Sequence, residues 1–413
     1  MNRLSFLISS FVVFISVVSK AQVTQELCQI SSTKELYERL KQNHPRIREN
    51  KAFLQMLLKN EDVASERPNP QLNLRVMSGK VVEGDFESGS ISFLHTIELG
   101  GKRDSRKKLA KTFSEKFRFE LKDLNEDLFV DGILKSYRLR QIYDLIPLYQ
   151  EAKSALSKIY KIKSKRSSLS PEEQVAKETL SLAISDYQLK VTHLKAEMFN
   201  LSHHLALFVG EDCEISKKAL PRKVDEGQMF KLTGDLENSI KSYSILKNAS
   251  KELELARKTL ELERSHIYPD LQIGPAFQRQ RVNGIGYDTF GLQVSMGLPI
   301  LNSNKGSRMK SLEEIKRASL RYKNIEHESK HDLGVWVREY RFLKESLNSI
   351  ESGNELEKKH QKIEKLFKRG IISTSMVIES HRQLIEFAKT RDQYELRLTK
   401  ALWNIYKIQG KVL

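Results

Sequence analysis

The 413-residue sequence is poor in cysteine and proline, and after its first residues it has no long apolar run. Two cysteines are too few for a fold held together by many disulfides, and nine prolines leave room for long uninterrupted helices. No later segment approaches the roughly 20 consecutive apolar residues that a membrane-spanning helix requires. If the mature chain enters a membrane, it must therefore do so as β-strands, whose alternate residues can be polar.

The charge of the chain is strongly positive, with 70 basic and 53 acidic residues and a formal net charge of +17. A basic balance of this size raises the question of nucleic-acid binding. The basic residues are instead spread along predicted helices, without interleaved aromatic residues and without a nucleic-acid motif. We therefore expect no nucleic-acid partner.

One short motif suggests enzyme chemistry. His327-Glu328-Ser329-Lys330-His331 matches the H-E-x-x-H pattern of zinc proteases. A catalytic zinc site needs a third protein ligand and a buried helix, but here the flanking residues are charged and no downstream pattern supplies a ligand. A solvent-exposed helix face explains the motif better, so we expect no cofactor, no resident metal and no enzymatic activity. A zinc protease stays as a minor alternative that predicts bound metal.

The N-terminus has the organisation of a secretory signal peptide. Met1-Asn2-Arg3 is positively charged, Leu4–Val18 is almost wholly apolar, and Ser19-Lys20-Ala21 places small residues at a cleavage site. We expect residues 1–21 to be removed and the rest of the chain to be exported. In an oxidising compartment Cys28 and Cys213 could form a disulfide, and two unpaired thiols are the alternative.

The remaining sequence repeats itself. Asn69-Pro70-Gln71-Leu72 is echoed by Tyr268-Pro269-Asp270-Leu271, and Lys165-Arg166 is echoed by Lys368-Arg369. A unit of this length is too long for a solenoid repeat, so we expect one architecture built from two related halves. The predicted parts are a first structural repeat over residues 22–210, an inter-repeat linker over 211–235 and a second structural repeat over 236–413.

Very long helices are expected in each half. Between residues 103 and 163 the only glycine is Gly132 and the only proline is Pro147, and residues 307–368 are similarly uninterrupted apart from Gly334 and Gly353. A helix of about 60 residues reaches about 90 Å, which is too long for a compact core and indicates a rod, a coiled coil or a tube. Two further segments have heptad-like apolar seams, at Leu180, Ile184, Tyr187, Val191, Leu194, Met198, Leu201 and Leu205, and at Leu384, Phe387, Arg391, Tyr394, Leu398, Ala401, Ile405 and Ile408.

Each half also contains two predicted strands. In the last of them Phe290, Leu292, Val294, Met296 and Leu298 alternate with small or polar residues. Such alternation fits a membrane strand, although a soluble hairpin packed on helices alternates too. Four strands cannot close a barrel, so a membrane location requires several chains to share one. The strands are predicted at about 71–82, 90–99, 271–279 and 287–298, with polar loops at Ser78–Gly89 and Arg279–Asp288.

The order of these features resembles the TolC family of outer-membrane channel proteins over essentially the whole mature chain. The residues that carry the resemblance are Asn43-His44-Pro45-Arg46-Ile47, Ile97-Glu98-Leu99-Gly100-Gly101-Lys102-Arg103, Leu298-Pro299-Ile300-Leu301-Asn302 and Asn304-Lys305-Gly306. The Glu-Leu-Gly-Gly-Lys-Arg form looks most like the heavy-metal efflux branch of the cobalt–zinc–cadmium type.

This resemblance implies a mainly α fold with a small β part. A homotrimer would form a shared transmembrane β-barrel of twelve strands, continued by an α-barrel across the periplasm. The implied function is a passive exit duct in the outer membrane, conducting substrates that include metal cations. Its implied partners are outer-membrane lipid, a periplasmic adaptor (membrane fusion) protein and an inner-membrane pump of the RND type. The alternative is a soluble periplasmic coiled-coil adaptor or scaffold, which would carry a compact β-rich domain and a single helical hairpin.

The resemblance also implies functional residues at the periplasmic end. The family has a glycine followed by acids six and nine positions later, and here Gly370 leads to Met376 and Glu379. Glu379 would ring the periplasmic gate and favour cations, while Met376 replaces the inner acid. The adaptor would dock at the helical tips, which comprise Ser168, Leu169, Ser170, Pro171, Gly370, Ile371, Ile372 and Ser373.

Overall fold

The computed structural model of the chain describes residues 28–81, 84–210, 213–221, 240–282, 284–350, 361–363, 365–367, 369 and 371–412. The predicted signal peptide over residues 1–21, the tip residue Gly370 and most of the predicted linker over 211–235 lie outside the described residues. The long helices are α2 (Pro45–Ser65), α3 (Lys102–Ser164), α4 (Pro171–Val209), α6 (Ser244–Ser265), α7 (Lys305–Ser349) and α9 (Thr374–Ile408), and α1 (Thr33–Gln42) is shorter. The strands are β1 (Cys28–Ile30), β2 (Gln71–Val81), β3 (Gly84–Ile97), β4 (Cys213–Ile215), β5 (Leu271–Val282) and β6 (Ile285–Met296), and η1 (Lys217–Ala219) and η2 (Ile240–Ser242) are 3₁₀ turns.

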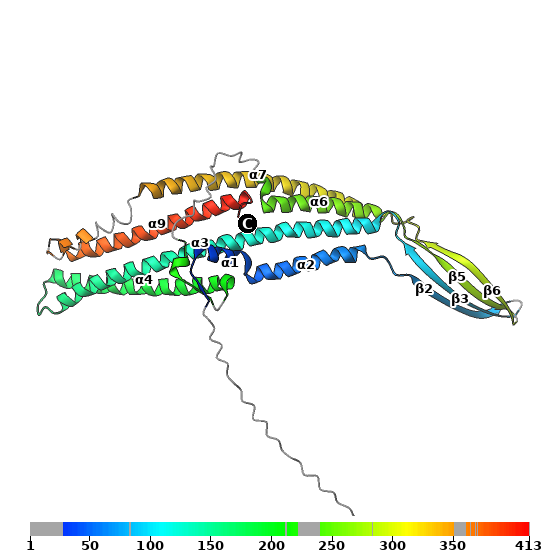
Figure 1. Cartoon of the computed structure of the whole chain (residues 1–413), viewed down its shortest axis with the longest axis horizontal. Helices are drawn as coiled ribbons and strands as arrows, with labels where there is room; N and C mark the ends of the chain where they lie inside the picture. The colour runs from blue at the N-terminus through cyan, green and yellow to red at the C-terminus, as the bar shows by residue number, and fades with distance from the viewer. Residues whose placement is uncertain are drawn as a thin grey trace, which may run out of the picture.

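The molecule is an elongated helical rod with a four-stranded sheet at one end (Figure 1). Helix α3 runs from the sheet to the far end of the rod, and its 63 residues span roughly 95 Å at the α-helical rise. This confirms the long helix predicted over residues 103–163. No helix within the described part of the chain combines the length and the apolar character needed to cross a membrane.

The middle of the rod contains an aromatic core that joins elements from both ends of the sequence. The ring of Phe129 on α3 lies edge-on to Tyr37 of α1 at 5.9 Å and to Trp403 of α9 at 5.4 Å between ring centroids. Gly132 of α3 permits this approach, because a Cβ there would lie 2.6 Å from a methyl carbon of Leu40 on α1. Aromatic edge-to-face pairs add to the area they bury, so this core ties α1 and α9 to α3.

A second core continues from the middle of the rod toward the end remote from the sheet. It is formed where α3, α4 and the first half of α9 pack together, with Ile142 and Leu156 of α3 fully buried. The seam predicted on α4 is confirmed, because Leu180, Tyr187, Val191, Leu194 and Leu205 are buried. The seam predicted on α9 is confirmed only in its second half, at Leu398, Ala401, Ile405 and Ile408.

The first half of α9 is rotated from the predicted register. Val377, His381 and Ile385 are buried there, whereas Arg391, a predicted seam position, is exposed. The predicted seam begins at Leu384, whereas the buried residues Val377, His381 and Ile385 are spaced by four and bring Ile385 to the core instead. The seam of an ideal α-helix drifts relative to a strict seven-residue pattern.

Buried charges connect the helices near the middle of the rod. Lys407 of α9 is 7 % exposed, and its ammonium lies 3.0 Å from a carboxylate oxygen of Asp123 and contacts Asp127. Glu126, on the next turn of α3, is fully buried and accepts a hydrogen bond from the Ser244 hydroxyl at the start of α6. Burial raises the pKa of Glu126. Removing one partner of such a buried set leaves an uncompensated charge and is costly, so the set fixes how α3, α6 and α9 align.

A small parallel sheet forms beside this region. β1 pairs with β4, and the register places Cys28 opposite Cys213. Cys213 is disulfide-bonded, and Arg39 of α1 donates a hydrogen bond to the carbonyl of Val209 at 3.1 Å. The residues just after α4, which were expected to be linker, therefore include a strand and the 3₁₀ turn η1.

The four-stranded sheet is wholly antiparallel, with the order β2-β3-β5-β6. Strands β3, β5 and β6 extend further toward the distal turns than predicted, because most of Ser78–Gly89 and Arg279–Asp288 lies within strands. Strand β2 ends at Val81, close to its predicted end at 82. Gly84 and Gly284 adopt positive φ angles of 122° and 81° beside these turns, which glycine tolerates at low cost. The strands also end earlier than predicted at the helical side, at Ile97 and Met296.

The pairing of the two hairpins depends on a close backbone approach at Gly274. A Cβ at this position of β5 would lie 1.8 Å from the carbonyl oxygen of Phe93 on β3. We predict that Gly274→Ala lowers the free energy of unfolding by about 1–3 kcal/mol, the usual cost of overpacking. Denaturant titration of the protein in detergent measures this, with Gly291→Ala on β6 as the matched control because its added Cβ meets nothing within 4 Å. Equal stability of the two variants would contradict the close approach.

A partly buried aspartate, Asp392, makes the packing of α9 on α3 pH-dependent. Burial raises the pKa of Asp392 from 3.8 to about 7, Glu395 adds to the rise, and Arg140 and Arg138 oppose it. Between about pH 4 and pH 7 the folded chain keeps a proton that the unfolded chain loses, so stability falls as pH rises through this window. We predict that Asp392→Asn raises the midpoint of thermal unfolding more at pH 8 than at pH 5, as followed by circular dichroism. The exposed Asp186→Asn is the control, and equal gains at both pH values would refute the prediction.

Candidate functional site

One face of the four-stranded sheet is apolar and exposed. Register places Leu74, Ile91, Phe277 and Phe290 in one row across the four strands, and the rings of Phe277 and Phe290 lie 4.8 Å apart. Their exposed fractions are large, with 69 % for Leu74 and 82 % for Phe290. The same face continues through Leu72, Val76, Phe93, Ile97, Leu271, Ile273, Pro275, Leu292, Val294 and Met296. An exposed apolar surface of this extent marks a membrane or protein contact.

The opposite face of the sheet is polar. It carries amides and hydroxyls, and Gln278 donates a hydrogen bond to the Ser88 hydroxyl across the β3–β5 pair at 3.1 Å. The surface is hollowed along this side, where the lining includes Asn73, Arg75, Ser90, Ser92, Gln278, Thr289 and Gln293. A sheet with one apolar face and one hydrated face is what a strand pattern with alternating apolar and polar residues produces.

The apolar face ends in charges at the distal turns. Arg279 and Asp288 form a two-pronged ion pair with both nitrogen–oxygen distances at 2.7 Å, and Arg281 lies 3.7 Å from Glu87. These residues share the face of Phe277 but follow it toward the turns. The apolar rows from Leu271 to Phe277 therefore cover about 20 Å along the strand, at 3.4 Å per residue, before charge appears.

The junction between sheet and helices uses the motif that resembles the heavy-metal branch. Gly100 and Gly101 have φ angles of 73° and 72°, which turn the chain between β3 and α3. Lys102 lies 2.5 Å from Asp270, and Arg106 forms an ion pair with Glu98. The motif therefore orients the sheet on the rod. It provides no metal ligand set.

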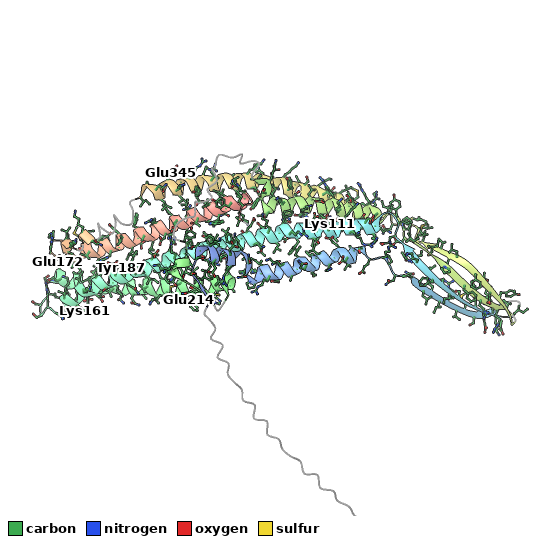
Figure 2. The ribbon with its side chains drawn as sticks, in the orientation of Figure 1. Lys111, Lys161, Glu172, Tyr187, Glu214 and Glu345 are labelled. Atoms are coloured by element: carbon green, nitrogen blue, oxygen red, sulfur yellow. The ribbon has the colours of Figure 1, made fainter. Side chains whose placement is uncertain are left out.

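The opposite end of the rod is formed by the end of α3 and the starts of α4 and α9. A capping box begins α4, because the Ser170 hydroxyl accepts a hydrogen bond from the Glu173 backbone amide and the Glu173 carboxylate accepts one from the Ser170 backbone amide. Ser373 caps α9 in a similar way through the Met376 amide. A groove at this end is lined by Lys163, Glu172, Glu173, Val175, Ala176, Thr179, Phe367, Ile372, Ser373, Thr374, Ser375 and Ile378. Figure 2 labels Lys161 and Glu172 at this end and Lys111 nearer to the sheet.

The predicted tip residues lie here, with one exception. Ser168 and Leu169 follow α3, Ser170 and Pro171 begin α4, and Ile371 to Ser373 precede α9, whereas Gly370 is outside the described part of the chain. Ile371 is 64 % exposed and Ile372 lines the groove. The two predicted tip segments are thus brought to the same end of the rod.

Glu379 is exposed on the second turn of α9, but it is not a free carboxylate. Arg382 donates two hydrogen bonds to it at 2.7 and 2.8 Å, and Gln383 donates a third at 2.8 Å. The Arg382 hydrogen bonds, followed by that of Gln383, lower the pKa of Glu379. Met376 lies one turn earlier and is 58 % exposed. The spacing of Glu379 and Arg382 in the sequence was the available signal for this pair.

The zinc-protease motif lies on the surface of α7. His327 and His331 are both exposed, and His331 lies 3.7 Å from the carboxylate of its neighbour Asp332. Within the described ranges, no group of three or more histidine, cysteine or acidic side chains is arranged to hold a metal ion. The arrangement gives no support to a protease.

The sequence matches no protein-family model and no curated protein sequence. The structure, in contrast, is similar to solved outer-membrane channels. It matches CusC with a TM-score of 0.72 at 13 % identity over 92 % of both chains, in a study of its folding and transmembrane channel formation. It matches the outer-membrane channel OprN with a TM-score of 0.71 at 14 % identity over 92 % of this chain and 89 % of that chain. The open-state MtrE outer membrane channel of Neisseria gonorrhoeae gives 0.71 at 12 % identity over the same shares. The chain therefore has the fold of these outer-membrane channels.

Proposed function

We propose that the chain is one subunit of an outer-membrane exit duct that passively conducts solutes out of the periplasm. The observation that carries this proposal is the two-faced sheet, with a broad exposed apolar face, a hollowed polar face and a long helical rod behind it. The apolar face would contact lipid and the polar face would line water. The fold that the chain shares with solved outer-membrane channels also supports the proposal of an exit duct.

The assembly we propose is a homotrimer. Strands β2 and β6 are the edges of the sheet and pair on one side only among the described residues. Unpaired backbone groups are not tolerated in hydrocarbon, so each edge strand must find a partner in another copy. Three copies with four strands each would close a twelve-stranded barrel, and their helices would continue it as an α-barrel.

The internal organisation follows from the same proposal. The order α2-β2-β3-α3-α4 is followed by α6-β5-β6-α7-α9, and we interpret these as two tandem structural repeats over residues 22–210 and 236–413. Residues 1–21 would direct export and be removed. We further propose that Cys28 and Cys213 form the disulfide of this chain, since they are paired in the β1–β4 register. Closing a loop of this length is worth about 5 kcal/mol in the chain-entropy model.

We propose that a periplasmic adaptor protein docks at the helical tips and links the duct to an inner-membrane pump of the RND type. The groove between the starts of α4 and α9 combines apolar residues such as Phe367 and Ile372 with a polar surround, and Ile371 is exposed nearby. Protein contacts commonly bury such a mixed surface. The duct itself would perform no chemistry. A soluble adaptor or scaffold is less favoured, because it would leave the apolar face of the sheet in water.

Metal cations are the cargo that the sequence resemblance favours. The motif behind that resemblance forms ion pairs at the sheet–helix junction, however, and holds no ligand set. The structure thus adds no argument for metal, and the choice of solute depends on the charges that line the path.

The membrane orientation of the sheet can be tested with neighbouring residues on opposite faces of β6. Leu292→Arg puts a charge on the apolar face, at a cost of about 2–4 kcal/mol at the bilayer midplane. We expect the wild type to yield a heat-modifiable, detergent-extracted trimer by gel mobility and light scattering, and we predict that this variant does not. Gln293→Arg is the matched control on the polar face and should assemble. A wild-type chain that is a monodisperse monomer without detergent would reject the duct.

The proposed gate at Glu379 can be tested through its ion pair. Glu379→Ala leaves Arg382 without its partner carboxylate, so we predict a lower cation permeability in planar bilayers. Arg382→Ala removes the partner of the Glu379 carboxylate and should raise cation permeability, so the two variants are expected to have opposite effects. Leak conductance measured in the same recordings reports on closure at Met376 and Glu379. Unchanged single-channel behaviour in both variants would remove Glu379 from the gate.

A further inference from the structure

The charges of the four-stranded sheet are divided unevenly between its two faces. Six lysine, arginine, aspartate or glutamate side chains share the apolar face, all of them toward the distal turns, and they are Lys80, Asp85, Glu87, Arg279, Arg281 and Asp288. Over the described strand residues, the polar face carries a single residue of these four types, Arg75 of β2. Arg75 therefore sets the electrostatic character of that face.

The neighbours of Arg75 leave its charge uncompensated. Its cross-strand row contains Ser90, Gln278 and Thr289, which carry hydroxyls and amides. The rows on either side contribute Asn73, Ser92, Ala276 and Gly291, and Met77, Ser88, Gln280 and Tyr287. No acidic side chain of the described chain lies within ion-pair distance of Arg75. The guanidinium of Arg75 therefore places a positive charge in the hollow that this residue lines.

We infer that Arg75 makes the sheet-enclosed part of the duct prefer anions, an inference that rests on the proposed function. In a closed trimer, three copies of Arg75 would form one ring at a single level of the lumen. Rings of arginine or lysine select for anions, as rings of acids select for cations. The other described strand residues on this face carry no lysine, arginine, aspartate or glutamate side chain. The field of such a ring extends about 8 Å at physiological ionic strength.

The other end of the rod does not cancel this preference. The carboxylate that the resemblance places at the gate, Glu379, is matched by Arg382 in the same subunit. A ring of three such pairs is close to neutral. The favoured solutes are therefore small or extended anions, such as carboxylates and phosphate esters, rather than free metal cations.

The test is the reversal potential of single channels of the full-length assembled protein in planar bilayers under a KCl gradient. We expect wild-type channels to favour chloride over potassium. Arg75→Gln should lower the chloride-to-potassium permeability ratio several-fold, and Arg75→Glu should invert the preference. Lys80→Gln is the matched control, because it removes the same charge from the same strand but from the opposite face. Its ratio should equal that of the wild type.

A second measurement avoids variants that fail to assemble. Arg75→Cys channels can be modified after assembly with thiol reagents of either charge, and Cys213 is protected in its disulfide. The cationic reagent should restore the chloride preference and the anionic reagent should reverse it. The inference would be overturned if the permeability ratio did not change with the charge at position 75, or if Lys80→Gln changed it as much as Arg75→Gln. Either result would leave the proposed duct function unaffected. An absence of conductance in wild-type protein that is correctly folded would overturn the duct itself and the inference with it.

Discussion

Unpaired backbone at the two edges of a small sheet is the constraint on which this molecule depends. β2 and β6 each have one side without a strand partner in the described chain, and the face between them is apolar and exposed. In water, the unpaired backbone groups of the edge strands can hydrogen-bond to solvent, but the exposure of the apolar face is unfavourable. In lipid, the apolar face is favourable, but the unpaired backbone groups have no hydrogen-bond partner. Sharing strands between copies in a bilayer satisfies both demands. The proposed trimer is the simplest arrangement that does so.

The helices hold this incomplete sheet at a defined distance from the middle of the rod. α3 provides one continuous element from the sheet to the opposite end, and the turn at Gly100 and Gly101 sets the angle at which the sheet leaves it. The Phe129 core and the buried Lys407 ion pairs then bind α9 to α3 near the middle. Because these contacts lie away from both ends, they leave the apolar face of the sheet and the helical tips exposed for the lipid and partner contacts that we propose.

Much of the helical part could be predicted from the sequence, since α3 lacks breakers other than Pro147 and the seam of α4 keeps a regular period. The apolar halves of the strands were predicted from their alternation. Their distal ends were not, because Ser78 and Gly89 occupy positions on the apolar face without an apolar side chain, and this pattern is typical of a loop. The predicted seam of α9 was wrong at Leu384 and Arg391, because the buried face there continues the four-residue spacing of His381 and Ile385. At the tips, Glu379 was identified from the sequence, but its ion pair with Arg382 was not. Arg75 was not identified, because only the strand register shows that it is the single charged residue among the described residues of the polar face.

The ion pairs at the distal turns have a consequence for how deeply the sheet sits. Arg279–Asp288 and Arg281–Glu87 follow the last apolar rows on the lipid-facing side of the proposed barrel. Sinking the sheet further would drag four ionised groups into hydrocarbon, and raising it would lift the rows of Phe290 and Leu292 into water. The vertical position of the assembly is thus fixed by its own surface chemistry. In the proposed duct, a bilayer of unsuitable thickness would have to stretch or thin around the sheet, so the assembly would prefer membranes of matching thickness.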